Sequence, residues 1–173
     1  MIRKAGNWIV NKWENAKSDN EPTRMDTAAA DGDLAAVTKL HADGAKCTYW
    51  AIDLAASHGY LNVITFLDKC SPSPFKSIGA RELRSTSSAM DMACKNGHMA
   101  TVKYLHETMK APHCDNSMAW ACAAGQLDIV KYLTEKVKMD YYPYAIIMAR
   151  KNNHTLVVQY LEKYGHPHRY SKS

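Results

Sequence analysis

Histidine and cysteine are the residue types in this sequence that could carry acid–base, nucleophilic or metal chemistry, and several of them recur at equivalent positions of a repeating pattern. His98 and His154 each follow a residue typical of a tight turn, and His41 and His106 each follow the last leucine of an apolar segment. Side chains that recur at equivalent points of a pattern are expected to serve the fold. We therefore predict a structural role for these four histidines.

The other candidates for chemistry are no stronger. His166 and His168 offer only two ligands on a polar tail, fewer than a zinc site needs, and favour a solvated tail. The five cysteines are odd in number and form no C-x-x-C pair, which argues against a disulfide framework and a zinc site. Cys94 and Cys122 share one repeat position and are expected to be small buried residues. Without a Ser-His-Asp set or a phosphate loop, the sequence predicts no catalytic residue, no metal site, no cofactor and no enzymatic activity.

The composition is that of an ordinary globular chain and favours helices. The 173 residues are 46% hydrophobic and 23% charged, and only 8 glycines and 6 prolines are present, too few for the many turns of a β-sandwich. No run approaches the roughly 18 apolar residues that a membrane-spanning helix needs. The cysteine usage and a start, MIRKAGNWIVNKW, without the apolar core of a secretory signal predict an intracellular protein, cytoplasmic or mitochondrial.

A sixteen-residue pattern occurs five times in the sequence, and no copy contains an insertion or a deletion. Its copies begin at Met25, Ile52, Met90, Met118 and Ile146. Each copy places a turn residue between two apolar segments, namely Gly32, Gly59, Gly97, Gly125 and Asn153, at spacings of 27, 38, 28 and 28. Glycine or asparagine between helical segments indicates a turn with positive φ. Each copy is therefore predicted to be a helix, a turn and a second helix, and the copies must stack into a solenoid to bury their apolar stripes.

Three sets of positions predict how these helices pack. Small residues ahead of each turn should let neighbouring helices approach closely, and they are Ala28, Ala29, Ala55, Ala56, Ala93, Cys94, Ala121 and Cys122. Apolar residues behind the turn recur at helical spacing, as in Leu61, Val63, Ile64 and Leu67 and again in Leu127, Ile129, Val130 and Leu133. A third set, Leu54, Met92, Trp120 and Met148, aligns on the first helices. We interpret this third set as core between repeats rather than as a ligand groove.

The segments AASHGYLNVITFL and ACKNGHMATVKYL resemble the ankyrin repeat, in which a helix ending in Ala-Ala-x-x-Gly-His is followed by Leu-x-x-Val-x-x-Leu. The resemblance covers about residues 25–165 and implies an all-α, ankyrin-type helix-turn-helix solenoid of about five units. The copies are spaced by 28 residues instead of the usual 33 and lack a Thr-Pro-Leu-His start. In both respects they are similar to the short-finger variety of ankyrin repeat found in protists and large DNA viruses. In the fifth copy Arg150 and Thr155 replace a small and an apolar residue, which suits a terminal cap.

The segments outside the repeats are basic. We expect an amphipathic extension helix at 1–24, an insert at 71–86 within the solenoid 25–165, and a tail at 166–173. Five bases and three acids lie in residues 1–24, and three bases and one acid lie in each of 71–86 and 162–173. These segments together carry a charge of +6, whereas the net charge of the whole chain is +5. The insert is either part of a binding face or a solvated loop. The extension is either a mitochondrial transit segment or a docking helix that buries Trp8 and Trp13.

The resemblance implies a non-catalytic protein-interaction module that binds a partner on the concave repeat face. The contact positions carried over to this chain are the two residues before each turn, Ala30, Asp31, Ser57, His58, Lys95, Asn96, Ala123, Ala124, Lys151 and Asn152. The segregated charge favours an alternative, a structural subunit of a large ribonucleoprotein assembly such as a mitochondrial ribosome. Its basic extensions would contact RNA phosphates through Arg3, Lys4, Lys12, Lys76, Arg81, Arg84, Arg169 and Lys172.

Overall fold

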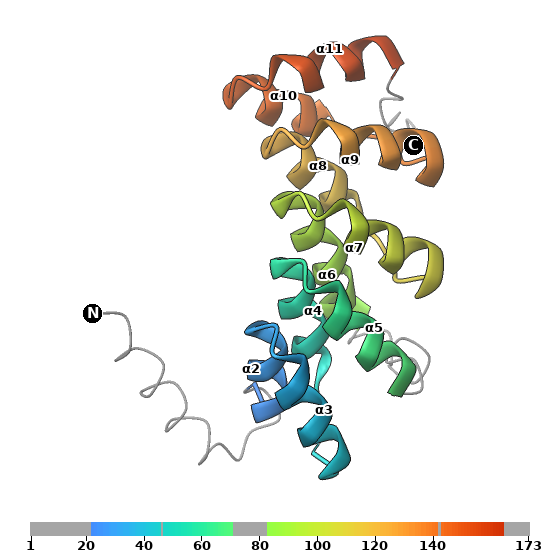
Figure 1. Cartoon of the computed structure of the whole chain (residues 1–173). Helices are drawn as coiled ribbons and strands as arrows, with labels where there is room; N and C mark the ends of the chain where they lie inside the picture. The colour runs from blue at the N-terminus through green and yellow to red at the C-terminus, as the bar shows by residue number, and fades with distance from the viewer. Residues whose placement is uncertain (1–21, 46, 71–82, 142, 165–173) are drawn as a thin grey trace, which may run out of the picture.

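The computed structural model describes residues 22–45, 47–70, 83–141 and 143–164, which form five helix-turn-helix units (Figure 1). The first helices are α2 (Arg24–Ala30), α4 (Tyr49–His58), α6 (Leu83–Asn96), α8 (Asp115–Ala123) and α10 (Pro143–Lys151). The second helices are α3 (Leu34–Ala42), α5 (Leu61–Cys70), α7 (Met99–Lys103), α9 (Leu127–Tyr132) and α11 (Thr155–Tyr164). Two π-helical turns, Tyr104–Thr108 and Leu133–Val137, continue α7 and α9.

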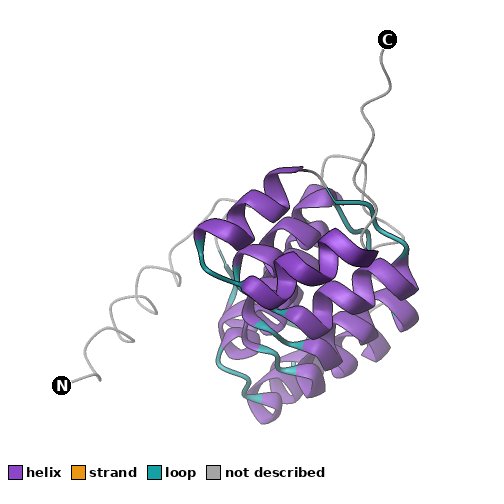
Figure 2. Cartoon of the chain, turned by 90° about the horizontal axis from the view of Figure 1, so that it is seen from above, coloured by secondary structure: helices purple, strands orange, loops and turns teal. Residues whose placement is uncertain are grey.

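The units stack so that the first helices form one column and the second helices form another (Figure 1). We call these the inner and the outer column. The described ranges contain helices and loops and no strand (Figure 2), so the predicted all-α solenoid is confirmed. The expected N-terminal extension helix lies outside those ranges up to residue 21, and the tail 166–173 lies outside them as well. So does the insert up to residue 82, while its last four residues belong to the start of α6.

Local sequence signals explain where several of these helices begin. Thr23 and Asp26 form a capping box on α2, in which each side chain accepts a backbone N–H of the other residue. The Asp33 side chain accepts the N–H of Ala36 at 2.9 Å and caps α3. At α4 the Thr48 side chain accepts the N–H of Trp50. Side-chain oxygens thus satisfy backbone donors that a helix start leaves free.

The predicted turns are confirmed. The φ angles are 72° at Gly32, 76° at Gly59, 81° at Gly97 and 73° at Gly125, and Asn153 adopts 61°. L-residues with a Cβ rarely adopt this left-handed region, which explains the choice of glycine and, in one unit, asparagine. The backbone therefore reverses direction in the same way in every unit.

The small positions ahead of the turns are also confirmed as core. Their side chains, Ala28, Ala29, Ala55, Ala56, Ala93, Cys94, Ala121 and Cys122, are all buried. From the second helices the core takes Val63, Ile64, Leu67, Ile129, Val130 and Leu133, while Leu61 and Leu127 are only partly buried. The core thus lies between the two columns and between successive units.

The interpretation of the third apolar set as core is wrong. Leu54, Met92 and Met148 are only half-buried, and 40% of the Trp120 side chain is exposed. These residues lie on the side of the inner helices that faces away from the outer column, because the opposite side carries the buried alanines and cysteines. Helical spacing places them on one shared face but supplies no element to cover that face.

The fifth unit differs from the others on its far side. Arg150 forms an ion pair with Glu162, and both side chains are exposed. Ile147 and Leu156 are exposed as well, by 55% and 67%. This side of the described stack is therefore mixed, with a charged pair next to apolar side chains.

Candidate functional site

The exposed side of the inner column, which we call the inner face, is the candidate binding surface. It is lined by Leu54, Met92, Trp120 and Met148, one from each of α4, α6, α8 and α10. Partly exposed apolar residues that align over several repeats form a continuous surface rather than scattered spots. An extended surface of this kind can hold a partner without any chemical step.

Two residues of the predicted contact set are engaged by the preceding repeat. The Asn96 amide donates a hydrogen bond to the carbonyl of Ser57 at 2.6 Å, and the Asn152 amide donates to the carbonyl of Ala123 at 2.6 Å. Both side chains remain exposed at their edges. Their first role is to tie one turn to the turn before it, which the sequence reasoning did not foresee.

The histidines after the turns complete the same connection. His98 Nε2 lies 3.0 Å from the Ser57 carbonyl oxygen, and His154 Nε2 lies 3.0 Å from that of Ala123. Each carbonyl therefore accepts from an asparagine and from a histidine of the next unit. The predicted structural role of these two histidines is confirmed.

The other two recurring histidines also contact the next repeat. The ring of His41 packs edge-on against Phe66, with ring centroids 5.7 Å apart. His106 Nδ1 lies 3.0 Å from the hydroxyl of Tyr132. Both contacts lie between second helices, so these histidines too serve the stacking of the repeats.

The rest of the predicted contact set divides by position. His58 caps its own helix through Nδ1, which lies 2.9 Å from the Leu54 carbonyl oxygen. Ala30 and Asp31 lie at the first turn, while Ala123 and Ala124 present only methyl groups at the fourth. Lys95 and Lys151 are exposed, and Lys95 Nζ lies 4.7 Å from the centroid of the Trp120 ring. The two lysines are thus the cations of this set.

A pocket of about 180 Å³ opens on the inner face between α8 and α10. Its walls are Asn116, Ala119, Trp120, Ala123, Tyr144 and Met148. Tyr144 is 59% exposed, and together with Trp120 it gives the pocket two aromatic lining residues. Tyr144 was not among the sequence candidates, because the repeat pattern begins two residues after it.

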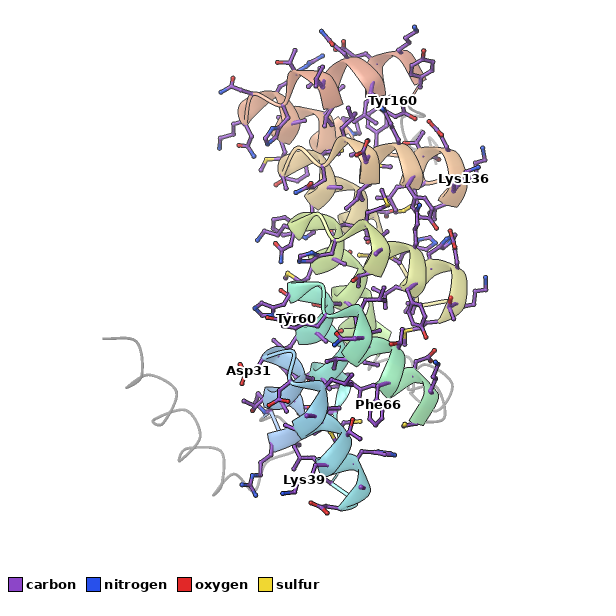
Figure 3. The ribbon with its side chains drawn as sticks, viewed as in Figure 1. Asp31, Lys39, Tyr60, Phe66, Lys136 and Tyr160 are labelled. Carbon is purple, nitrogen blue, oxygen red and sulfur yellow. The ribbon has the colours of Figure 1, made fainter. Side chains whose placement is uncertain are left out.

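The outer column carries a ladder of tyrosine–carboxylate hydrogen bonds. Tyrosine hydroxyls donate to acids of the preceding unit in three pairs, Tyr104 to Asp68 at 2.9 Å, Tyr132 to Glu107 at 2.8 Å and Tyr160 to Glu135 at 2.8 Å. Burial and the carboxylate partner raise the pKa of each tyrosine to about 12. Tyr160 and Lys136 mark this column in Figure 3. Tyrosine recurring one residue before the last leucine was a sequence signal that could have predicted the ladder.

The potentially reactive side chains of the inner helices serve packing. Cys94 and Cys122 are buried as predicted, and burial raises the pKa of Cys122 to about 12, so that it stays a thiol. Asp91 accepts a hydrogen bond from the Ser117 hydroxyl at 2.5 Å and another from the Cys114 thiol. Across the described ranges no three His, Cys, Asp or Glu side chains gather in a way that could hold a metal ion.

The predicted anionic-partner contacts fall almost entirely outside the described residues. Arg84 lies on the first turn of α6, and the other seven belong to segments that the structure does not describe. Among the helices that are described, none is both long and apolar enough to cross a bilayer.

Comparison with known proteins places this repeat stack in a family. No curated protein matches the chain. A chain in the crystal structure of the yeast ribosomal protein Rps3 in complex with its chaperone Yar1 is 26% identical, and the match covers 67% of this chain and 92% of that chain with a TM-score of 0.49. The family model for ankyrin repeats (3 copies) matches residues 52–143, more than half of the sequence. The chain therefore belongs to the ankyrin-repeat family.

Proposed function

We propose that this chain binds a protein partner on its inner face and performs no chemistry of its own. Ankyrin repeats form protein-interaction modules, and the family is typically non-catalytic, which supports the general assignment. The observation that carries the choice of face is the row of large apolar side chains, one per repeat, that the core leaves partly exposed on α4 to α10.

The sizes of the packed side chains support a concave inner face. Alanine and cysteine separate the inner helices, as at Ala55, Ala93 and Cys122, whereas tyrosine, leucine and valine separate the outer helices. Smaller side chains bring helices closer together, so the stack should curve toward the inner column. A concave surface can enclose a partner from several repeats at once.

The polar groups of the outer column argue against a binding role for that side. Its tyrosine hydroxyls and their carboxylates already bond to one another between units. Lys103 and Lys131 also lie over the rings of Tyr132 and Tyr160, at 5.9 Å and 6.0 Å from the ring centroids. A partner there would have to replace contacts that hold the repeats together.

The test is affinity purification of the full chain from its native cells, with mass spectrometry of the bound proteins. Trp120→Glu should release the bound partner, because a carboxylate would disrupt the inner face. Leu156→Glu, which makes the same kind of change on exposed α11, should retain it, and both variants should keep the helical circular dichroism of the parent. A partner lost from the α11 variant and kept by the Trp120 variant would rule out the inner face.

The ribonucleoprotein hypothesis remains the second candidate, because the basic excess lies in the additions rather than in the repeats. In that role the repeats would pack on proteins of the assembly while lysines and arginines of the additions contact phosphates. The same purification, with and without nuclease, separates the two hypotheses. Loss of all bound protein after nuclease treatment would favour the ribonucleoprotein.

A further inference from the structure

The pocket between α8 and α10 differs from the rest of the inner face in having two aromatic walls. Trp120 and Tyr144 are 40% and 59% exposed, and Ala123 leaves the space beside Trp120 open. Pockets for small-molecule ligands occupy roughly 300–1,000 Å³, so a hollow of about 180 Å³ suits one anchoring side chain. Tryptophan and tyrosine are the residue types most enriched where binding energy concentrates in protein interfaces.

The lysines near this pocket favour a negatively charged ligand. Lys95, Ala123 and Lys151 are equivalent positions of three successive repeats, so that one lysine lies on each side of the small residue. Neither lysine forms an ion pair with any part of the chain that the structure describes. Lys95 Nζ instead lies 4.7 Å from the centroid of the ring of Trp120, which is one of the residues that line the pocket. A carboxylate over Ala123 would lie between two cations and beside an apolar hollow.

We propose, on the basis of the inner-face function above, that the partner presents an acidic peptide segment with one large apolar side chain. The apolar side chain enters the pocket between Trp120 and Tyr144, and flanking carboxylates pair with Lys95 and Lys151. Burial of the apolar anchor supplies most of the affinity, while the lysines supply selectivity and faster association.

A single-stranded nucleic acid is the rival occupant, since bases stack on aromatic rings beside basic side chains. The geometry favours the peptide. Besides its two aromatic rings and the polar Asn116, the pocket is lined by Ala119, Ala123 and Met148, whose apolar side chains suit an aliphatic or aromatic side chain.

The test selects phage-displayed random peptides on the immobilised full chain and then measures the affinity of the enriched peptides. They should share a leucine, methionine or aromatic residue flanked by Asp or Glu. Trp120→Ala should weaken them about thirtyfold, the typical cost of a central interface residue. Lys95→Glu with Lys151→Glu should weaken them about tenfold or more, whereas the matched outer-column control Lys136→Glu should leave affinity unchanged (Figure 3).

Further measurements make each outcome decisive. If Trp120→Ala loses helicity, Tyr144→Ala on the opposite wall takes its place. Enriched peptides that lack acids, or that bind the double lysine variant equally well, overturn this proposal. If Met92→Glu abolishes the binding of such peptides, the inner face is still the binding surface and only the acidic-peptide proposal is wrong. If no substitution on the inner face changes their binding, the proposed inner-face function is wrong as well. Binding of a fluorescent oligouridine that requires Trp120 also overturns the peptide assignment.

Discussion

His98 occupies the space that a side chain on Gly59 would need. A Cβ at Gly59 would lie 2.5 Å from His98 Nδ1, and the same histidine bonds to the Ser57 carbonyl two residues before that glycine. Gly125 and His154 repeat the arrangement, again with 2.5 Å between the added Cβ and Nδ1. The glycine therefore serves two needs, a left-handed turn and a close contact with the next repeat.

Gly59→Ala should destabilise the protein more than Gly44→Ala. Both glycines have nearly the same positive φ, 76° and 75°, but a Cβ at Gly44 would meet no atom of the described residues within 4 Å. We expect Gly44→Ala to lower the free energy of unfolding by about 1 kcal/mol from backbone strain alone. Gly59→Ala should lower it by a further 1 to 3 kcal/mol, roughly, because His98 must move. Urea denaturation measures both.

A double-mutant cycle with His98→Ala separates these contributions. In the His98→Ala background, Gly59→Ala should cost no more than Gly44→Ala, because the obstructing ring is gone. An unchanged cost for Gly59→Ala in that background would show that the ring is not the source of the difference.

Tyr132→Phe should destabilise the stack by about 1 kcal/mol. The change removes a hydroxyl that donates to Glu107 at 2.8 Å and lies 3.0 Å from His106 Nδ1. Tyr144→Phe is the matched control, since this tyrosine is 59% exposed and should tolerate the loss of its hydroxyl. Thermal unfolding of the two variants provides the comparison. Equal losses at Tyr132 and Tyr144 would mean that the ladder adds nothing to stability.

Asp53 should make the protein less stable as the pH rises toward 8. Burial raises the pKa of this carboxyl to about 8, the nearby charge of Asp91 adds to the effect, and the N–H of Ala89 opposes it. Its Oδ1 is buried and has no hydrogen-bond partner among the residues that the structure describes. From about pH 4 to pH 8 folding takes up a proton, so the free energy of unfolding falls with pH, by at most about 1.4 kcal/mol per unit.

Asp53→Asn should flatten this pH dependence and stabilise the protein near pH 8, because the amide needs no proton to stay neutral. Urea midpoints at about pH 5 and pH 8 measure the effect. A variant whose midpoint shifts with pH as much as that of the parent would assign the dependence to other groups.

The ribonucleoprotein hypothesis predicts a strong dependence on salt. Affinity for the native assembly should fall with a logarithmic slope of about −0.7 per single-strand phosphate contact. Neutralising Arg81, Arg84, Arg169 and Lys172 together should make that slope shallower. Binding that is indifferent to salt and survives nuclease would instead support a protein partner on the inner face.

The repeat register, the turns and the small core positions could all be predicted from the sequence. Gly97 and the equivalent glycines indicate a left-handed turn because few other residues tolerate positive φ. Ala93 and Cys94 indicate a close contact between helices because their side chains are small. These properties depend on single residues or on their spacing along the chain, so they can be recognised in the sequence alone. The recurrence of tyrosine at positions 104, 132 and 160 is also visible in the sequence. Its carboxylate partners could be identified only from the structure.

Only the tertiary structure shows which side chains on the inner helices are available to contact a partner. Lys95 and Asn96 are neighbours in sequence and look alike as surface residues, yet Asn96 bonds to Ser57 of the preceding repeat while Lys95 lies over Trp120. Periodicity places Trp120 on a shared face with Met92 and Met148 but does not say whether another element covers it. Coverage depends on how far apart the stacked units lie, and that distance is set by contacts between residues that are 29 or 39 positions apart in the sequence.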